Sequence, residues 1–327
     1  MSYEIICRAE SAWQADCLEV VGSKRMSISA QRTLRRTVPC AGIGLHSGQK
    51  VTLALKPAPA GHGIRFRRTD LGGLEIPASV AYLGGGQQLQ TGLVADKASV
   101  ETVEHLLAAL RSLGIDNAIV ELNHFEVPIM DGSSAPWVYL IQDAGIKELS
   151  APRKTIQILK HVQVQHGDKR IAVYPADRFK ISYTISFDHP LLRHQQKTLD
   201  LDEQTFIDEI APARTFGFLK EVEMLRQRGM ALGGSLENAI VLGETGVLNP
   251  LRFDDEFVRH KILDVIGDLA LVEHPIQGHL VVHRGGHALH TAFASELMRQ
   301  RDAWRLVEDA TPVDVAAHAP VHVPVRH

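Results

Sequence analysis

One histidine and two aspartates recur every four residues in the second half of the chain, at His260, Asp264 and Asp268. Residues four apart on an α-helix project from one face, so His260 and Asp264 can hold a single metal ion between them. The residues between them are mostly apolar, and a polar stripe on such a core-like helix is unusual. The spacing indicates a metal-binding helix; the alternative is a solvated face whose carboxylates pair with Arg259 or Lys261.

A second candidate for metal chemistry is the adjacent pair Glu104 and His105, near the start of an amphipathic segment. Neighbouring residues on a helix point about 100° apart. One of the two can therefore bind a metal while the other reaches a water molecule beside it. The alternative is a buried histidine next to a glutamate that caps the helix.

Two shorter motifs carry groups suited to acid–base or carbonyl chemistry. Gly285 and Gly286 let the backbone approach a ligand closely, and His287 follows them, where it can act as an acid, a base or a ligand. Thr215 precedes Phe216, and its hydroxyl can polarise a carbonyl under an apolar roof. Each motif alone also fits a structural role, as a turn with a surface histidine or as a strand end with core phenylalanines.

The elements that must position these groups follow from the periodicity of apolar residues. Alternation predicts strands over residues 33–38, 51–55, 63–68, 117–122, 155–165, 171–174, 179–187, 239–242 and 280–282. Apolar spacing of three to four predicts helices over residues 100–112, 135–144, 219–228, 254–271 and 288–299. Ser99 is the expected N-cap of the first of these helices.

The order of these elements predicts the fold class. In each half of the chain strands come first and helices later, which favours an α+β fold over a parallel βαβ sheet. We expect a two-layer sandwich of two similar α+β domains with the active site between them. The expected divisions are an N-terminal extension that is disordered or dispensable (1–25), two domains (26–151 and 152–310) and a C-terminal tail (311–327).

Composition excludes several classes of protein. Of the 327 residues, 45% are hydrophobic and 22% are charged, which is enough to build a globular core. The formal net charge of −3 does not suit a general nucleic-acid binder. No apolar run reaches the roughly 18 residues of a membrane span, and the N-terminus does not resemble a secretory signal. Three cysteines without C-x-x-C spacing argue against a disulfide framework, so we expect a cytoplasmic enzyme.

Together these motifs resemble the family of UDP-3-O-acyl-N-acetylglucosamine deacetylases, zinc enzymes of the committed step of lipid A synthesis. The resemblance runs from Gln31 to about Leu297. Its motifs, in chain order, occupy residues 31–34, 42–48, 102–106, 128–133, 213–218, 257–264 and 286–289. In one departure, the chain has Leu89-Gln90-Thr91 where some members carry a cysteine near the active-site entrance.

The resemblance implies a role for each candidate residue. It makes His105, His260 and Asp264 the ligands of Zn²⁺, a set that Fe²⁺ would also accept. It makes Glu104 the general base and His287 the catalytic histidine, with Asp268 orienting it. The remaining implied residues contact the substrate: Thr215 and Lys261 at the reacting carbonyl and phosphate side, Lys169, Phe187 and Arg284 at the nucleotide, and Phe216 beside them.

The implied reaction is hydrolysis of the N-acetyl group of a UDP-linked acylated glucosamine, with release of acetate. Glu104 would take a proton from water, Thr215 and protonated His287 would stabilise the oxyanion, and His287 would protonate the leaving amine. The family also has an apolar passage for the acyl chain, which by position would lie within residues 218–241. A plain helix core explains the same apolar pattern. We expect the enzyme to work as a monomer.

Two other functions remain open at this point. Another zinc amidohydrolase or a peptidase could use a His-x-x-x-Asp helix, although the chain has no H-E-x-x-H motif. A non-catalytic protein that binds UDP-sugars or acyl chains would be expected to lack ligands or the base, and this chain retains them all.

Overall fold

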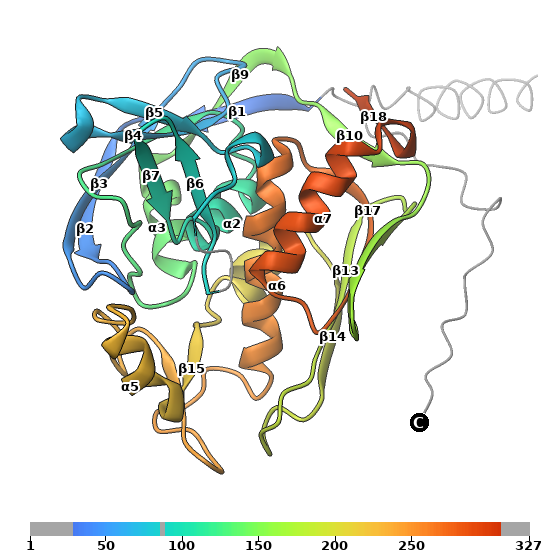
Figure 1. Cartoon of the computed structure of the whole chain (residues 1–327). Helices are drawn as coiled ribbons and strands as arrows, with labels where there is room; N and C mark the ends of the chain where they lie inside the picture. Colours follow the sequence, from blue (N-terminus) through green and yellow to red (C-terminus); the bar gives the residue numbers. More distant parts are fainter. Residues whose placement is uncertain (1–28, 86–88, 309–327) are drawn as a thin grey trace, which may run out of the picture.

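Two large β-sheets with helices between them form the body of the protein (Figure 1). The structure is a computed structural model, and it describes residues 29–85 and 89–308. The expected extension (1–25) and tail (311–327) lie outside the described residues. The mixture of helices and largely antiparallel sheets confirms the predicted α+β class. Among the described residues, no helix is both long and apolar enough to cross a membrane.

The first large sheet has five strands in the order β2-β3-β8-β4-β5. They are β2 (Val38–Ile43), β3 (Lys50–Pro57), β8 (Ala118–Leu122), β4 (Ile64–Arg68) and β5 (Leu74–Pro77). Only β4 and β8 pair in parallel; the other neighbours are antiparallel. Alternate residues of β3 and β8 are buried, as the period-two pattern predicts for a sheet with one covered face.

The second large sheet has seven strands, built around the long strand β17 (Ile276–His283). β17 pairs with β12, β10 and β13, and the other strands add to these. The remaining members are β10 (Thr155–Ile158), β11 (Val162–His166), β12 (Lys169–Tyr174), β13 (Phe179–Ile185), β14 (Gln195–Asp200) and β18 (Trp304–Val307).

Three two-stranded sheets complete the strands: β1 with β9, β6 with β7, and β15 with β16. Their bounds are β1 (Ala30–Leu34), β9 (Ile146–Pro152), β6 (Gly92–Ala95), β7 (Ala98–Glu101), β15 (Phe216–Phe218) and β16 (Ile240–Leu242). β9 ends at Pro152, and β10, which belongs to the seven-stranded sheet, begins at Thr155. We therefore propose the division into residues 26–151 and 152–310.

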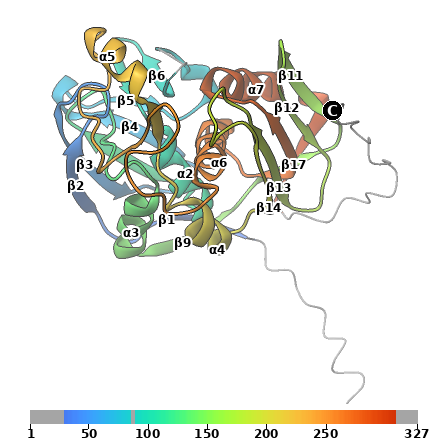
Figure 2. The same ribbon diagram turned by 90° about the horizontal axis from the view of Figure 1, so that it is seen from below.

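The helices lie mainly between the two large sheets (Figures 1 and 2). The longer ones are α2 (Glu104–Ser112), α3 (Ala135–Ala144), α5 (Leu219–Gln227), α6 (Glu256–Leu269) and α7 (His287–Arg299). Short turns of helix are η1 (Thr69–Leu71), η2 (Val80–Tyr82), α4 (Glu203–Thr205), η3 (Phe206–Ile210), η4 (Ala270–Val272) and η5 (Arg301–Ala303). α6 packs on β13 and β14, α7 packs on β11 and β12, and α2 packs on α6.

Helix α6 is the centre of the apolar core. Almost all of its residues are buried, including Ile262, Val265 and Ile266. A helix buried on nearly every face must be covered from more than one side, and α6 contacts both α2 and strands β13 and β14 of the seven-stranded sheet. The carboxylates of Asp264 and Asp268 are therefore buried, so the alternative of a solvated face is wrong.

The predicted start of the first helix is also wrong. Residues 98–101 form strand β7, and α2 begins at Glu104 with Val103, not Ser99, at the N-cap position. Thr102 separates the two elements with a φ of 58°, a left-handed conformation that is uncommon for a β-branched residue. Because the sequence offers no glycine at this point, the pattern gives no sign of the break.

The prediction of a single strand over residues 155–165 is likewise wrong, because the structure has two strands there, β10 and β11. β10 lies between β17 and β18, whereas β11 lies at the outer edge of the sheet beside β12. The chain must leave one position to reach the other. Between them the backbone N–H groups of Leu159 and Lys160 donate to the carbonyl oxygen of Ala303.

The contact between α2 and α6 depends on Gly267. A Cβ atom at this position would overlap the backbone carbonyl group of Glu104. The missing side chain lets the start of α2 lie directly on α6, one turn from Asp264 and beside Asp268. Glycine costs a helix interior about 1 kcal/mol relative to alanine, so the close approach is made at the expense of helix propensity.

We expect Gly267→Ala to destabilise the protein, although alanine is the better helix former. The propensity gain of about 1 kcal/mol is smaller than the roughly 1–3 kcal/mol cost of overpacking against a rigid backbone group. Urea unfolding measures the difference. In the control, Gly246→Ala, the new Cβ meets no atom within 4 Å, and stability should stay within about 0.5 kcal/mol. A Gly267→Ala protein as stable as the wild type would contradict this account of the helix contact.

Candidate metal centre and active site

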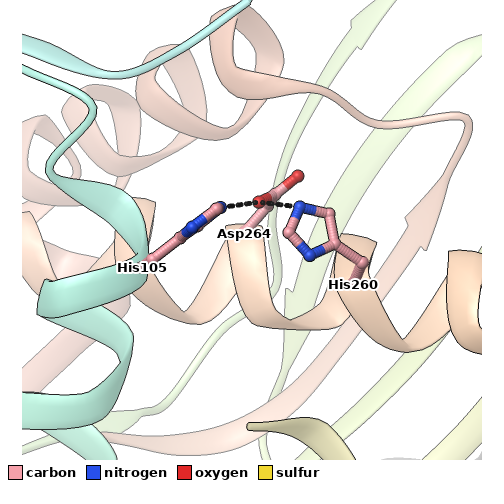
Figure 3. Close-up of side chains that lie close together, drawn as sticks. All are labelled: His105, His260 and Asp264. Atoms are coloured by element: carbon pink, nitrogen blue, oxygen red, sulfur yellow. Dashed lines mark ion pairs between the residues drawn. The ribbon is translucent and has the colours of Figure 1, made fainter. Parts of the chain in front are cut away.

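His105, His260 and Asp264 converge at the contact between α2 and α6 (Figure 3). The Nε2 atom of His260 lies 3.2 Å from Oδ1 of Asp264, and Nε2 of His105 lies 3.7 Å from the same oxygen. All three side chains are buried. The spacing of four on α6 brings two of them together, and the approach of α2 adds the third from the other half of the chain.

The geometry of this cluster fits a tetrahedral metal ion. Ligand atoms about 2.0–2.1 Å from Zn²⁺ lie about 3.3 Å from one another, close to the two separations from Asp264 Oδ1. That oxygen is buried and makes no hydrogen bond, although buried polar atoms nearly always have a partner. A cation held by both imidazoles and this oxygen would satisfy it. The cluster is therefore a candidate metal site.

A hydrogen bond to a backbone carbonyl group, on the side of the ring away from the cluster, fixes the orientation of His260. Its Nδ1 atom lies 3.1 Å from the carbonyl oxygen of Ala213 and must carry the proton of that hydrogen bond. This tautomer leaves the lone pair of Nε2 directed at the cluster, as a metal ligand requires.

The segment before β15 that supplies this carbonyl is held on α6 by a buried ion pair. Arg214 donates from its backbone N–H and from Nε to Oε1 of Glu256, at 3.0 and 2.9 Å, and the backbone N–H of Arg252 donates to Oε2. Glu256 is fully buried in the first turn of α6. Burial raises the pKa of Glu256, but the hydrogen bonds from Arg214 and Arg252 outweigh it and hold the pKa below its ordinary value.

A cavity of about 120 Å³ opens beside the three converging side chains. Eight predicted site residues line it: Glu104, His105, Thr215, Phe216, His260, Lys261, Asp264 and His287. Leu45, Leu89 and Thr102 complete its wall. Residues as far apart in the sequence as Leu45 and His287 therefore share one cavity, and it combines two carboxylates, three imidazoles, an ammonium and two hydroxyls.

His287 is the first residue of α7, and Asp268 supports it from behind. Its Nδ1 atom donates to Oδ2 of Asp268 at 2.9 Å, and its Nε2 atom lies 3.7 Å from Oδ2 of Asp264. Burial lowers the pKa of His287, but the charges of Asp268 and Asp264 prevail and raise it to about 9. Burial raises the pKa of Asp268, but the charge and hydrogen bond of His287 bring it down to about 2. Near neutral pH the pair is therefore an imidazolium beside a carboxylate.

Glu104 is the first residue of α2 and faces the same cavity. Its Oε2 atom accepts a hydrogen bond of 3.0 Å from the backbone N–H of Thr91. Burial raises the pKa of Glu104, and the nearby His287 and His105 only partly offset it. A carboxylate with a raised pKa next to a candidate metal site is suited to accept a proton.

The predicted substrate contacts lie at different distances from the cavity. The Lys261 ammonium donates to Oδ2 of Asp264 at 2.6 Å and lies 5.5 Å from the centre of the Phe216 ring. Phe187 packs edge-on against Phe216, with ring centroids 5.9 Å apart. Lys169 and Arg284 lie outside the cavity lining, where Arg284 pairs with Asp168 at 2.5 Å.

Three residues that the sequence analysis did not assign surround Asp268. The Thr91 hydroxyl donates to Oδ1 of Asp268 at 2.5 Å, His290 contacts Oδ2 at 2.8 Å, and Tyr183 contacts His290 at 2.9 Å. His290 follows His287 by three residues, and that helical spacing could have revealed it. Thr91 lies in the segment noted as a departure, whereas Tyr183 is one residue in an alternating strand and carries no signal of its own.

Comparison with known proteins gives a consistent result over most of the chain. The family model LpxC, described as UDP-3-O-acyl N-acetylglycosamine deacetylase, matches residues 31–299. A UDP-3-O-acyl-N-acetylglucosamine deacetylase of Pseudomonas entomophila is 50% identical over 298 residues, covering 89% of this chain and 98% of that protein. A protein of the same name from Alcanivorax borkumensis is 47% identical over 297 residues, again covering 89% and 98%.

We expect the Glu256→Gln variant to be less stable than the wild type by roughly 3 kcal/mol near pH 7, because it leaves Arg214 buried without its anion. The folded-state pKa of Glu256 is lowered, so its contribution is complete above the ordinary value of about 4.3. That contribution is lost as pH falls through the folded-state pKa. Denaturant unfolding between pH 7 and pH 3 should therefore show the gap between the two proteins closing.

Glu209, whose side chain is 43% exposed and pairs with Lys197, supplies the control. Glu209→Gln should cost no more than about 1 kcal/mol, as surface ion pairs do. A Glu256→Gln protein whose stability deficit does not change with pH would contradict the role given to this ion pair.

Proposed function

The chain belongs to the family of UDP-3-O-acyl-N-acetylglucosamine deacetylases, and we propose that the cavity between α2, α6 and α7 is where it removes the N-acetyl group. The enzyme hydrolyses UDP-3-O-acyl-N-acetylglucosamine and releases acetate, a step of lipid A biosynthesis. The observation that carries the assignment of the site is the convergence of His105, His260 and Asp264 beside Glu104 and His287.

Zn²⁺ is the metal that we propose for the cluster. Two neutral imidazoles and one carboxylate suit Zn²⁺ by ligand type, and Fe²⁺ is the alternative. The separations of 3.2 and 3.7 Å and the unpartnered Oδ1 of Asp264 support this assignment. A bound Zn²⁺ supplies Lewis-acid chemistry, which polarises an acyl oxygen and makes water a stronger nucleophile near neutral pH.

Glu104 acts as the general base in this proposal. Among the described residues, Glu104 and Asp264 are the two carboxylates that line the cavity, and Lys261 holds one oxygen of Asp264. The hydrogen bond from Thr91 N–H fixes Oε2 of Glu104 and leaves Oε1 to accept a proton from the attacking water. General bases of this kind contribute about 10²–10⁴-fold to a rate.

His287 acts as the general acid and stabilises the developing negative charge. The Asp268 carboxylate keeps its imidazole protonated and holds the ring by Nδ1, so Nε2 carries the proton that faces the cavity. This proton can be given to the leaving amine when the carbon–nitrogen bond breaks. Thr215 also lines the cavity, where its hydroxyl can donate to the oxyanion.

The anionic and apolar parts of the substrate need separate surfaces. We assign the diphosphate to Lys261, with Lys169 and Arg284 further out, and uracil stacking to Phe187. The acyl chain is assigned to α5, which has no buried residue and exposes Leu219 and Met224. A helix of the core would bury such residues. The exposure of Leu219 and Met224 therefore favours an acyl-chain passage over a plain helix core.

The working unit that we propose is a monomer in the cytoplasm. This chain alone supplies the candidate metal ligands, Glu104 and His287, which supports a monomer. Cys40 is a free thiol in the described part of the chain, and burial raises its pKa to about 11. A free, partly buried thiol with a raised pKa is compatible with a reducing compartment.

We expect one tightly bound zinc ion per chain, measurable by elemental analysis of the purified protein. His260→Ala should lose both the metal and the activity, because two remaining ligands hold Zn²⁺ poorly. His166→Ala, which changes an exposed histidine on β11, serves as the control and should keep both. Full deacetylation after complete removal of metal by a chelator would refute the metal assignment.

We expect a bell-shaped dependence of turnover on pH. Activity should rise as Glu104 ionises, at a pH above the ordinary carboxyl range because its pKa is raised. It should fall as pH passes about 9, where His287 loses its proton. Steady-state kinetics of acetate release across this range measures both limbs, which report the coupled site as a whole.

Two variants test which residue sets each limb of the pH profile. Glu104→Gln should keep its metal and lose turnover by about 10²-fold or more, because an amide cannot accept the proton. Asp268→Asn should move the falling limb to lower pH, because His287 then loses the anion that stabilises its charged form. Near wild-type turnover in metal-replete Glu104→Gln would require a different base.

A further inference from the structure

A buried hydrogen-bond chain leads away from the candidate active site into the core. Tyr183 on β13 contacts Nε2 of His290 through its hydroxyl at 2.9 Å, and Nδ1 of His290 contacts Oδ2 of Asp268 at 2.8 Å. The same Oδ2 atom accepts the hydrogen bond from His287. Tyr183, His290 and Asp268 are completely buried, and none of them lines the cavity.

The chemistry of these groups sets the direction of every hydrogen bond. An ionised Asp268 can only accept, so Nδ1 of His290 must carry a proton. Burial lowers the pKa of His290, and its contacts with Asp268 do not restore it. The ring is therefore neutral, and its Nε2 atom is an acceptor for the Tyr183 hydroxyl. Every polar atom of this hydrogen-bond chain has a partner, and only one tautomer of His290 satisfies them all.

The short distances distinguish this group from a second metal site. Asp268, His287 and His290 also lie close enough to be considered as metal ligands. However, the two imidazole Nδ1 atoms lie 2.8 and 2.9 Å from Oδ2 of Asp268, which are ordinary hydrogen-bond lengths. Atoms that share Zn²⁺ would be about 3.3 Å apart, given metal–ligand distances of about 2.0 Å.

The surrounding backbone is shaped to fit the tyrosine–histidine pair. A Cβ atom at Gly285 would lie 2.5 Å from the Tyr183 hydroxyl and 2.6 Å from Nε2 of His290. Gly285 stands in the loop that leads to His287. The pair therefore packs directly beneath the turn that delivers His287 to the cavity.

We propose that His290, held in one tautomer by Tyr183, is a positioning residue that fixes the Asp268 carboxylate and through it the ring of His287. The inference rests on the proposed function of Asp268 and His287. Asp268 has two oxygens, and three donors hold them: Thr91 on Oδ1, and His287 and His290 together on Oδ2. Because His290 lies on the same oxygen as His287, it prevents the carboxylate from turning away from the catalytic histidine.

Removing the ring while keeping the packing tests this role. His290→Leu should lower kcat by about tenfold, the lower end of what loss of an outer hydrogen-bond partner costs. KM and zinc content should not change, because His290 touches neither the cavity nor the metal ligands. His290→Asn should recover most of the lost turnover, since the asparagine amide can donate from nearly the same place as Nδ1. If His290 had a structural role alone, the kcat values of His290→Leu and His290→Asn would change in parallel with their thermal stabilities instead.

Tyr183→Phe provides a second test with little effect on packing. In the wild-type holoenzyme, the ¹⁵N NMR signals of His290 should show a proton on Nδ1 and a hydrogen-bonded Nε2. In Tyr183→Phe the Nε2 signal should lose that hydrogen bond, and kcat should fall severalfold at unchanged KM.

His279→Leu is the matched control, because His279 on β17 makes a similar contact of 2.9 Å with the hydroxyl of Ser182, the neighbour of Tyr183 on β13. It should leave kcat as in the wild type. The proposal is overturned if His290→Leu keeps wild-type kcat, or if its loss of kcat is matched by His279→Leu. Neither result would touch the proposed function, which fails instead if metal-replete Glu104→Gln keeps its turnover.

Discussion

The close approach of α2 and α6 at Gly267 is the constraint on which the site depends. His105 belongs to the first half of the chain and Asp264 to the second, and they meet only because no side chain separates the two helix backbones there. The same contact places Glu104 in the cavity lining with His287. The apolar core that surrounds α6 supplies the free energy that holds these polar groups together.

The arrangement brings an unusual number of charged groups out of water. Glu104, Asp264 and Asp268 are all buried, and isolated carboxylates in such surroundings would be very costly. Asp268 is compensated by protonated His287, and Asp264 by Lys261. Glu104 has only a backbone N–H and neighbouring imidazoles, and its pKa is raised accordingly. The least compensated carboxylate is thus the one to which the mechanism assigns proton uptake.

The sequence revealed those parts of the site that share one helix. The spacing of His260, Asp264 and Asp268 is a local property of α6, so it could be read directly. The addition of His105 and His287 required several motifs taken together, because nothing local shows which helices will meet. The helix start at Glu104 was misplaced because Thr102 adopts a left-handed conformation that the sequence does not signal. Tyr183 was missed because its contact with His290 is tertiary, whereas His290 was missed although it follows His287 by three residues on the same helix.

The two aspartates of α6 show how one helix supports two different tasks. Asp264 and Asp268 are one turn apart, both buried and chemically identical, yet their oxygens have different hydrogen-bond partners. Both oxygens of Asp268 are taken by hydrogen-bond donors, so its position and charge are committed to His287. Asp264 gives one oxygen to Lys261 and keeps Oδ1 without a hydrogen bond, facing two imidazole nitrogens. A fully bonded carboxylate is suited to orient a neighbour, and one with a free buried oxygen is suited to bind a cation. Their environments, and not their residue type, therefore separate the supporting aspartate from the ligand.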